Sequence, residues 1–448
     1  LRIAYILVVV NMLNGLRKLF RSLKIPPMIN LKAFKLMDQD DPLKLFRNHF
    51  FHQKNEIYLD GNSLGKMPKN IPEILGETIN NQWGKQLISS WNKGWLKLPN
   101  RLSEKYGKLL NASAEEIVFG ESTTVRLYQI LLALIQSGNY LDNLITDNLN
   151  FPTDLYVIDG LKKQFPKFKI NNIEYHNEIE ADIDLLKESI KKNPGIICLS
   201  LVTYKSCYYY PMKVLNQYAV KHKSIIVWDI SHGVGSVPID FKESETKIAV
   251  GCTYKYMNGG PGSPSFLYIE NGLHSLLENP IQGWFGHKNP FDFNPQYKSA
   301  QKLDHFKNGT PPILSMQAVE SGIDLTLKAG ILNIRDKSIK QSEMIIMAIK
   351  DQLNSFGYNL QSPKKFLRRG SHIAISHPNA WQICQALQKG GKNIPKIIPD
   401  FRPPNLIRLG ITPLYTSFED LWWVINQLEN IVESESYLRF NQIKPEVT

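Results

Sequence analysis

The chain has 448 residues, of which 43% are hydrophobic and 21% are charged, a balance typical of globular proteins with two or more domains. Its formal net charge is +12, but no basic run is interleaved with aromatic residues, which argues against a nucleic-acid-binding protein. The four cysteines show no CxxC spacing, which argues against a metal site or a disulfide framework and suits a reducing cytoplasm.

The first 27 residues differ from the rest of the chain. They contain five basic and no acidic residues, and their apolar run, 3–10, is far shorter than the roughly 20 residues of a membrane span. A signal peptide would need a strongly basic start and a cleavage site, and neither is evident. We expect a disordered leader or an over-extended reading frame, with a surface-binding helix as the alternative, and no stable membrane insertion.

Short apolar runs alternate with helix-like segments between residues 110 and 270. The runs lie at 116–119, 143–146, 196–202 and 224–229. Continuous apolar strands separated by helices indicate a mostly parallel sheet that is covered on both faces. Because ligands of such sheets bind beyond the carboxyl ends of the strands, side chains that follow these runs are candidate site residues.

Longer helical patterns dominate after residue 320. Helix-like stretches at 316–355, 379–390 and 417–434 surround strand candidates at 371–376 and 406–409, which predicts a smaller α+β domain. The segment 308–312 is a helix-start signal, so we place the boundary in the helix near 315–335. The predicted organisation is a leader (1–27), an N-terminal arm (28–65), a large domain (66–320) and a small C-terminal domain (321–448).

Hydroxyl side chains follow the first apolar run. Ser122, Thr123 and Thr124 precede a helix predicted over 123–136. Free N–H groups at a helix N-terminus with adjacent hydroxyls form a phosphate site. The alternative is simple N-capping by Ser122 or Thr123.

Two further strand ends carry candidate residues. After the second run, Phe151 could stack on a flat heterocycle and Asp154 could bond near a cofactor ring, or the segment is a turn with a helix cap. At the end of the third run, Ser200 could donate to a phosphate or support a ring, or it is a buried core hydroxyl.

A lysine and an aspartate form the strongest pattern. Lys255 lies between two tyrosines, after the apolar run 248–251 and before a Gly/Pro-rich turn, and desolvation there disfavours its charged form. Asp229 ends the strand-like run 224–229, and His232 follows it. A carboxylate for a pyridine nitrogen and an amine for an aldehyde are what pyridoxal phosphate (PLP) requires.

Arg408 lies inside an apolar strand and therefore needs an anion. The α-carboxylate of an amino-acid substrate or an internal Asp or Glu would supply it. Trp284 and Thr310 lie in loops rich in groups suited to binding, although an exposed loop tryptophan is also common at interfaces.

Together these segments resemble the kynureninase family, fold-type-I PLP enzymes of the class V aminotransferase superfamily. The resemblance covers about residues 30–435, in the expected order. The YLDGNSLG and GWFGH segments are specific to that family. The matching segments lie at 58–65, 90–95, 151–154, 228–232, 254–262, 283–287, 309–312 and 408–415.

The resemblance implies a large domain with a mostly parallel sheet flanked by helices, a smaller α+β domain, and a cytoplasmic homodimer with shared active sites. It implies hydrolysis of L-kynurenine, or its 3-hydroxy form, to anthranilate or 3-hydroxyanthranilate and L-alanine, in tryptophan degradation. Lys255 would hold PLP and shuttle protons, Asp229 would pair with the pyridine nitrogen, and Phe151 would stack on the ring.

Other positions take roles from the same resemblance. It assigns phosphate binding to Thr123, Thr124 and Tyr254, joined by Trp284 and Thr310 of the partner chain, and makes Tyr254 a candidate general acid. Further cofactor contacts are Thr153, Asp154, Ser200 and His232, and the substrate residues are Arg408, Asn62 and Ser63.

The chain departs from the family pattern in three places. Arg126 stands where the family usually has asparagine, Tyr204–Cys207 replaces a Tyr-x-Thr-Gly turn, and residues 1–27 have no counterpart. None of these departures removes a catalytic group.

Three other functions compete. A cysteine desulfurase needs a mobile nucleophilic cysteine, and the only C-terminal candidate, Cys384, lies in a helix-like segment with a buried pattern. An aminotransferase or lyase acting on another amino acid is the second. The third, an inactive PLP-fold binding module, is disfavoured because Lys255, Asp229 and Arg408 are all present.

Overall fold

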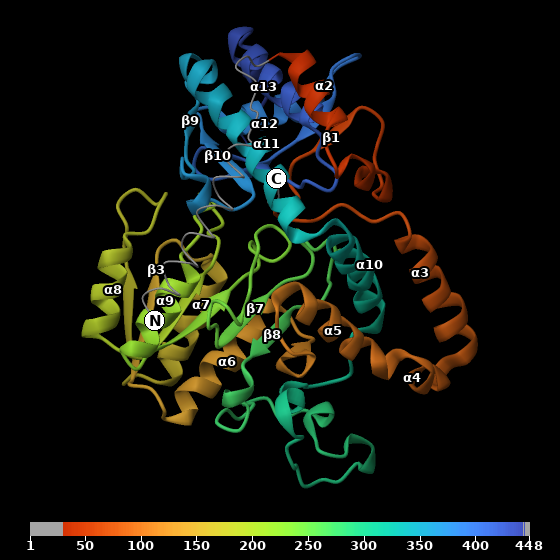
Figure 1. Cartoon of the computed structure of the whole chain (residues 1–448), viewed down its shortest axis with the longest axis vertical. Coiled ribbons are helices and arrows are strands. Elements are labelled where there is room, and N and C mark those ends of the chain that lie inside the picture. Colours follow the sequence, from red (N-terminus) through yellow and green to blue (C-terminus); the bar gives the residue numbers. More distant parts are fainter. Residues whose placement is uncertain (1–29, 442, 444–448) are drawn as a thin grey trace, which may run out of the picture.

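The structure is a computed structural model that describes residues 30–441 and 443 (Figure 1). The predicted leader, residues 1–27, therefore lies outside the described residues. Within the described part of the chain, no helix is both long and apolar enough to cross a membrane.

A seven-stranded sheet forms the centre of the larger part of the molecule, with strand order β2-β8-β7-β6-β5-β3-β4. Strands β4, β3, β5, β6 and β7 are parallel, and β8 runs antiparallel to both of its neighbours. The predicted, mostly parallel sheet is confirmed. The strands are β2 (Ile117–Phe119), β3 (Asn143–Asp147), β4 (Lys169–Ile173), β5 (Ile196–Ser200), β6 (Ile225–Asp229), β7 (Ile248–Gly251) and β8 (Phe266–Ile269).

Helices cover both faces of this sheet, as the continuous apolar strands require. In β5, Ile196 and Cys198 pack with α6 (Thr123–Ser137) and α7 (Pro152–Gln164). The alternate residues Ile197 and Leu199 belong to the opposite core. That core is completed by α5 (Leu98–Leu110), α8 (Ile183–Lys192) and α9 (Met212–Lys221).

The long helical pattern after residue 313 is two helices rather than one. Helix α10 (Ile313–Ala329) packs in the core of the large sheet, and α11 (Ile331–Asp351) packs in a second core. Gly330 separates them with a φ of +78°, a left-handed conformation that favours glycine and ends the first helix. The predicted domain boundaries remain predictions.

The second core contains a four-stranded antiparallel sheet of order β12-β13-β10-β9. Its strands are β9 (Asn359–Leu360), β10 (His372–Ser376), β12 (Asp400–Arg402) and β13 (Leu406–Gly410). Helices α12 (Ala380–Lys389) and α13 (Phe418–Glu433) pack on it, at the positions predicted from the sequence.

The N-terminal arm belongs to this second core. Helix α2 (Leu31–Gln39) lies beside α13, at the top of Figure 1, and buries Phe34. Strand β1 (Glu56–Tyr58) pairs in parallel with β11 (Lys396–Ile398). Residues that are distant in the sequence therefore share one hydrophobic core.

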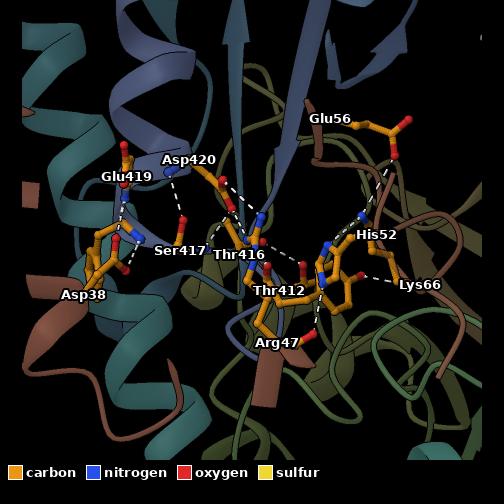
Figure 2. A network of polar contacts seen from close by, with 12 residues as sticks. Asp38, Arg47, His52, Glu56, Lys66, Thr412, Thr416, Ser417, Glu419 and Asp420 are labelled. Atoms are coloured by element: carbon orange, nitrogen blue, oxygen red, sulfur yellow. Dashed lines mark hydrogen bonds and ion pairs between the residues drawn. The ribbon is translucent and has the colours of Figure 1, made fainter. Parts of the chain in front are cut away.

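Polar contacts fix the arm on the first turn of α13, as Figure 2 shows. The carboxylate of Asp38 accepts hydrogen bonds from the N–H groups of Phe418 and Glu419, at 2.7 and 2.8 Å. Arg47 forms an ion pair with Asp420. Because the first N–H groups of a helix have no intrahelical partner, a carboxylate there satisfies them and is favoured by the helix dipole.

The end of the YLDGNSLG segment contacts the turn that carries the candidate lysine. The N–H of Gly65 donates to the carbonyl oxygen of Tyr254 at 2.7 Å. A Cβ at position 65 would overlap the carbonyl oxygen of Lys255 and come within 2.8 Å of the Asn258 Cα. Only glycine permits this close approach, which joins the arm to the sheet edge.

Candidate active site

A cavity of about 520 Å³ opens at the carboxyl ends of the sheet strands. It is lined by segments that follow β2, β3, β6 and β7, as the fold predicts for a ligand site. The structure brings together at this cavity the predicted residues Thr123, Thr124, Phe151, Thr153, Asp154, Asp229, Tyr254, Lys255 and Thr310.

The first turn of α6 forms one wall of the cavity. Ser122 caps the helix by accepting the N–H of Val125 at 3.3 Å, while Thr123 and Thr124 face the cavity. The N-cap leaves the phosphate-site prediction open, because it uses only one of the first N–H groups. Glu121, which was not predicted, also lines the cavity and adopts a φ of +59°, a costly conformation for a residue with a Cβ.

The side chain of Lys255 lies beside an imidazole and an aromatic ring. Its Nζ lies 3.2 and 3.3 Å from the two ring nitrogens of His232 and 5.6 Å from the centre of the Phe151 ring. Burial lowers the pKa of Lys255, and interactions with Cys252 and with Asp229 partly offset this shift. The amine is therefore easier to deprotonate than an ordinary lysine, as a nucleophile or base requires.

Two buried carboxyl groups, Asp229 and Asp154, share the cavity with Lys255. Burial raises the pKa of Asp229, while the Lys255 charge and hydrogen bonds from Ser231, whose N–H lies at 2.8 Å, oppose the rise. Burial, and then the Asp229 charge, hold the pKa of Asp154 well above its usual range. Of the two, Asp229 is the carboxyl group better placed to carry the negative charge.

His232 and Ser200 lie behind the cavity rather than in its lining. Burial, and then the Lys255 charge, hold the pKa of His232 well below its usual range, so the imidazole is neutral. Ser200 donates to the Oδ2 of Asp154 at 3.4 Å. Both residues orient a group that does line the cavity. Repulsion from Cys252, and then burial, raise the pKa of Tyr254, which keeps its hydroxyl protonated.

Arg408 belongs to a separate buried cluster. Its Nε pairs with Asp400, its Nη1 donates to the Tyr204 carbonyl oxygen at 2.5 Å, and its Nη2 donates to the Ser63 Oγ at 3.2 Å. The internal ion pair considered from the sequence is therefore present. Arg402 contacts the same Asp400 carboxylate at 3.1 Å. We call Ser63, Asp400, Arg402 and Arg408 the arginine cluster.

Sequence reasoning missed Asp400 and Arg402, although both are charged residues close to Arg408. Their signal is the antiparallel register of β12 and β13, which places Asp400 opposite Arg408. Nearby Asp60 has a pKa raised to about 6, by burial first and then by the Asp400 charge. The strand register of the β12–β13 hairpin, rather than a sequence motif, identifies the arginine cluster.

Three further predicted residues lie outside the cavity lining, besides His232, Ser200 and Arg408. Asn62 is fully buried, and its Oδ1 occupies the space that a side chain on Gly410 would need. Trp284 is 40% exposed and lies on the segment between β8 and α10, which loops away from the sheet in Figure 1. Ser63 lies in the arginine cluster. Thr310, predicted as a partner-chain residue, lines the cavity of its own chain.

The turn 204–207, which departs from the family pattern, connects the cavity with the arginine cluster. The Tyr204 ring meets the Phe151 ring edge-on at 5.2 Å, and its carbonyl accepts from Arg408. Cys207 adopts a φ of +66°, and its Sγ accepts the N–H of His372 at 3.2 Å. The backbone of Cys207 thus adopts a left-handed conformation that glycine would adopt without a steric cost.

The thiol of Cys384 has no role in this site. Cys384 is 1% exposed, lies in the second hydrophobic core, and has a pKa raised by burial. A reactive cysteine requires exposure and a lowered pKa, so this arrangement argues against a desulfurase.

The left-handed backbone at residue 207 leads to a stability prediction. Replacing Cys207 with glycine or with alanine removes the same thiol, but alanine keeps the steric cost of the positive φ. We expect Cys207→Gly to be more stable than Cys207→Ala by about 1 kcal/mol, measured by urea unfolding. Equal stabilities, or a more stable alanine variant, would contradict a left-handed turn at this position.

Comparisons with known proteins place this site in context. A family model described as "Kynureninase C-terminal domain" matches residues 334–428. The chain is 32% identical over 406 residues to a kynureninase of Burkholderia pseudomallei (strain K96243), covering 90% of this chain and 95% of that protein. It is also 32% identical over 418 residues to a kynureninase of Pseudomonas fluorescens, covering 92% and 98%.

Solved structures with a similar fold are more distant in sequence. The apo structure of a cysteine desulfurase from Thermococcus onnurineus NA1 superposes with a TM-score of 0.74 at 18% identity, covering 89% of this chain and 98% of that one. A C-DES variant with glycine covalently linked to its PLP cofactor gives a TM-score of 0.75 at 15% identity, covering 86% and 99%. At these identities the likeness shows the fold alone.

Proposed function

The chain belongs to the kynureninase family, and on that premise we propose that it hydrolyses the Cβ–Cγ bond of L-kynurenine, 3-hydroxy-L-kynurenine or both. The products are anthranilate, or its 3-hydroxy form, and L-alanine, a step of tryptophan degradation. The observation that supports the proposal most strongly is the partly buried Lys255, with a lowered pKa, in one cavity with Asp229 and the start of α6.

The cavity fits PLP in each part of that molecule. Lys255 supplies the amine for its aldehyde, Asp229 the carboxylate for its ring nitrogen, and Phe151 a flat wall for its ring. Thr123 and Thr124 at the α6 N-terminus are suited to its phosphate. When bound, PLP acts as an electron sink that makes the Cα proton of an amino acid acidic.

The protein side chains then handle protons and water. The Lys255 Nζ, whose lowered pKa makes its deprotonated form more accessible, accepts the Cα proton of the substrate and later returns it to Cα. The Tyr254 hydroxyl, kept protonated by its raised pKa, donates toward the substrate carbonyl oxygen. Water contributes its hydroxyl to Cγ, which becomes the anthranilate carboxylate, and a proton to Cβ, which becomes the methyl group of alanine.

The arginine cluster is the proposed site of the substrate carboxylate. Its three contacts use three of the five N–H groups of Arg408, and one N–H remains on each terminal nitrogen. Two N–H donors on one guanidinium match the two oxygens of a carboxylate. Asp400 fixes the guanidinium through Nε, so the ion pair orients Arg408 rather than competing for both terminal nitrogens.

A second subunit is proposed to complete the site, in a cytoplasmic homodimer. Trp284 packs against Phe285, Phe291 and Phe293 on the loop between β8 and α10, and Phe291 and Phe293 are more than half exposed. An exposed aromatic group of this kind favours an interface between subunits. Trp284 of the partner chain would then approach the phosphate, beside Thr310, which lines the cavity of its own chain.

The activity is tested by mixing the purified chain, PLP and L-kynurenine and following anthranilate fluorescence and alanine. We expect equal amounts of both products, with the 3-hydroxy substrate assayed in parallel. Lys255→Ala removes the base and should lower kcat by about 10²-fold or more. Lys247→Ala, at a surface ion pair with Glu270, is the matched control and should retain activity. Undiminished turnover by Lys255→Ala would contradict the assignment.

The carboxylate role of Arg408 predicts a change in KM. Arg408→Lys keeps the charge but loses the paired donors, so we expect KM for kynurenine to rise by about 10-fold, with a smaller change in kcat. Steady-state kinetics and a thermal unfolding control separate this effect from a loss of folded protein. An unchanged KM in a folded variant would show that Arg408 serves only its ion pair with Asp400.

The dimer is tested by sedimentation of the full chain with PLP. We expect a species of twice the 51.3 kDa monomer mass, and weaker PLP binding by Trp284→Ala within that dimer. Tyr156→Ala, a second exposed aromatic residue, is the control and should bind PLP normally. A fully active monomer would contradict the shared site.

A further inference from the structure

Arg126 is a buried cation directly behind the proposed phosphate site. It lies on the first turn of α6 and is only 1% exposed. Its Nε donates to the Gly120 carbonyl oxygen at 3.2 Å, and its Nη1 donates to the Phe306 carbonyl oxygen at 2.7 Å and the Gln129 Oε1 at 3.0 Å. All three acceptors are neutral.

The charge of this guanidinium is therefore not balanced by a hydrogen-bonded carboxylate. Burial lowers the pKa of Arg126 to about 10, and Glu121 opposes that shift from a distance. A cation in the first turn of a helix is also disfavoured by the helix dipole. A buried charge without a paired anion is costly, so an anion close to residues 120–124 would stabilise the folded protein.

The cavity lies on the other side of this backbone. Glu121, Thr123 and Thr124 line it, and Gly120 precedes them. A group that binds at the α6 N-terminus would therefore contact the turn whose Gly120 carbonyl oxygen accepts a hydrogen bond from Arg126. Fixed positive charge in a water-poor region is attractive to a dianion and has no effect on a neutral molecule of the same shape.

Arg126 also belongs to a hydrogen-bond network that holds the loop carrying Thr310. Gln129, which accepts from Arg126, donates to the side-chain oxygens of Asn279 and Asn308 at 2.8 and 2.9 Å. Asn308 in turn donates to Glu121 at 3.1 Å. The network therefore joins the helix, the cavity wall and the segment that ends at Thr310.

We propose that Arg126 is a positioning residue that makes this cavity selective for the dianionic phosphate of its cofactor, by placing a buried charge behind the cradle and by fixing the 279–310 segment. The proposal rests on the proposed function, because it takes PLP as the ligand. The proposal assigns a role to Arg126, one of the places where the chain departs from the family pattern.

The test compares PLP with pyridoxal, which has the same ring and aldehyde but no phosphate. The full chain is freed of cofactor, and both dissociation constants are measured by tryptophan fluorescence. Arg126→Gln removes the charge and keeps an amide donor, whereas Arg126→Lys keeps the charge. We expect Arg126→Gln to weaken PLP binding by about 10-fold and pyridoxal binding by less than about 2-fold, with Arg126→Lys close to the wild type.

The outcomes separate the inference from the proposed function. Equal weakening for PLP and pyridoxal, or equal loss in the Gln and Lys variants, would show that Arg126 only supports the fold and would overturn the inference. If the wild-type chain binds neither compound, the proposed function and the inference fall together. Inorganic phosphate provides a second readout, since it should raise the unfolding temperature of the wild type more than that of Arg126→Gln.

Discussion

The enclosure of the partly buried Lys255 by the buried Asp154, Asp229 and His232 is the constraint on which the rest of the structure depends. Each ionisable group loses hydration when it enters the protein, and the loss is tolerable only where another group compensates the charge. Here Lys255 stabilises the ionised Asp229, while Asp154 and His232 are shifted toward their neutral forms. The cluster thus holds an amine that readily loses its proton, which ordinary lysine on a surface cannot provide.

The architecture supplies the enclosure that this cluster needs. Parallel strands β6 and β7 end at the same edge, so Asp229 and the Lys255 turn meet although they are 26 positions apart. The N-terminal arm then closes the turn through the contact between Gly65 and Tyr254. Because the arm packs with the second core, the position of Lys255 depends on how the second core packs against the large sheet.

The same fold serves different reactions in its relatives, and the site decides between them. Cysteine desulfurases share the fold of this chain, yet its C-terminal cysteine is buried in a helix core. In this chain the arginine cluster lies beside the cavity and the lysine lies within it. Arg126 and Cys207 are each accommodated by hydrogen bonds to nearby backbone groups.

The sequence by itself determined the strand–helix alternation, the fold type and the lysine–aspartate pair, because continuous apolar strands and residues at their ends are local patterns. It also determined the family, since the motifs are contiguous. Tertiary structure alone decided that the arm belongs to the second core, that Asp400 pairs with Arg408, and that Arg126 lies behind the cavity wall. These features depend on contacts between segments far apart in the chain, and charge neutralisation by burial follows from packing that no local pattern encodes.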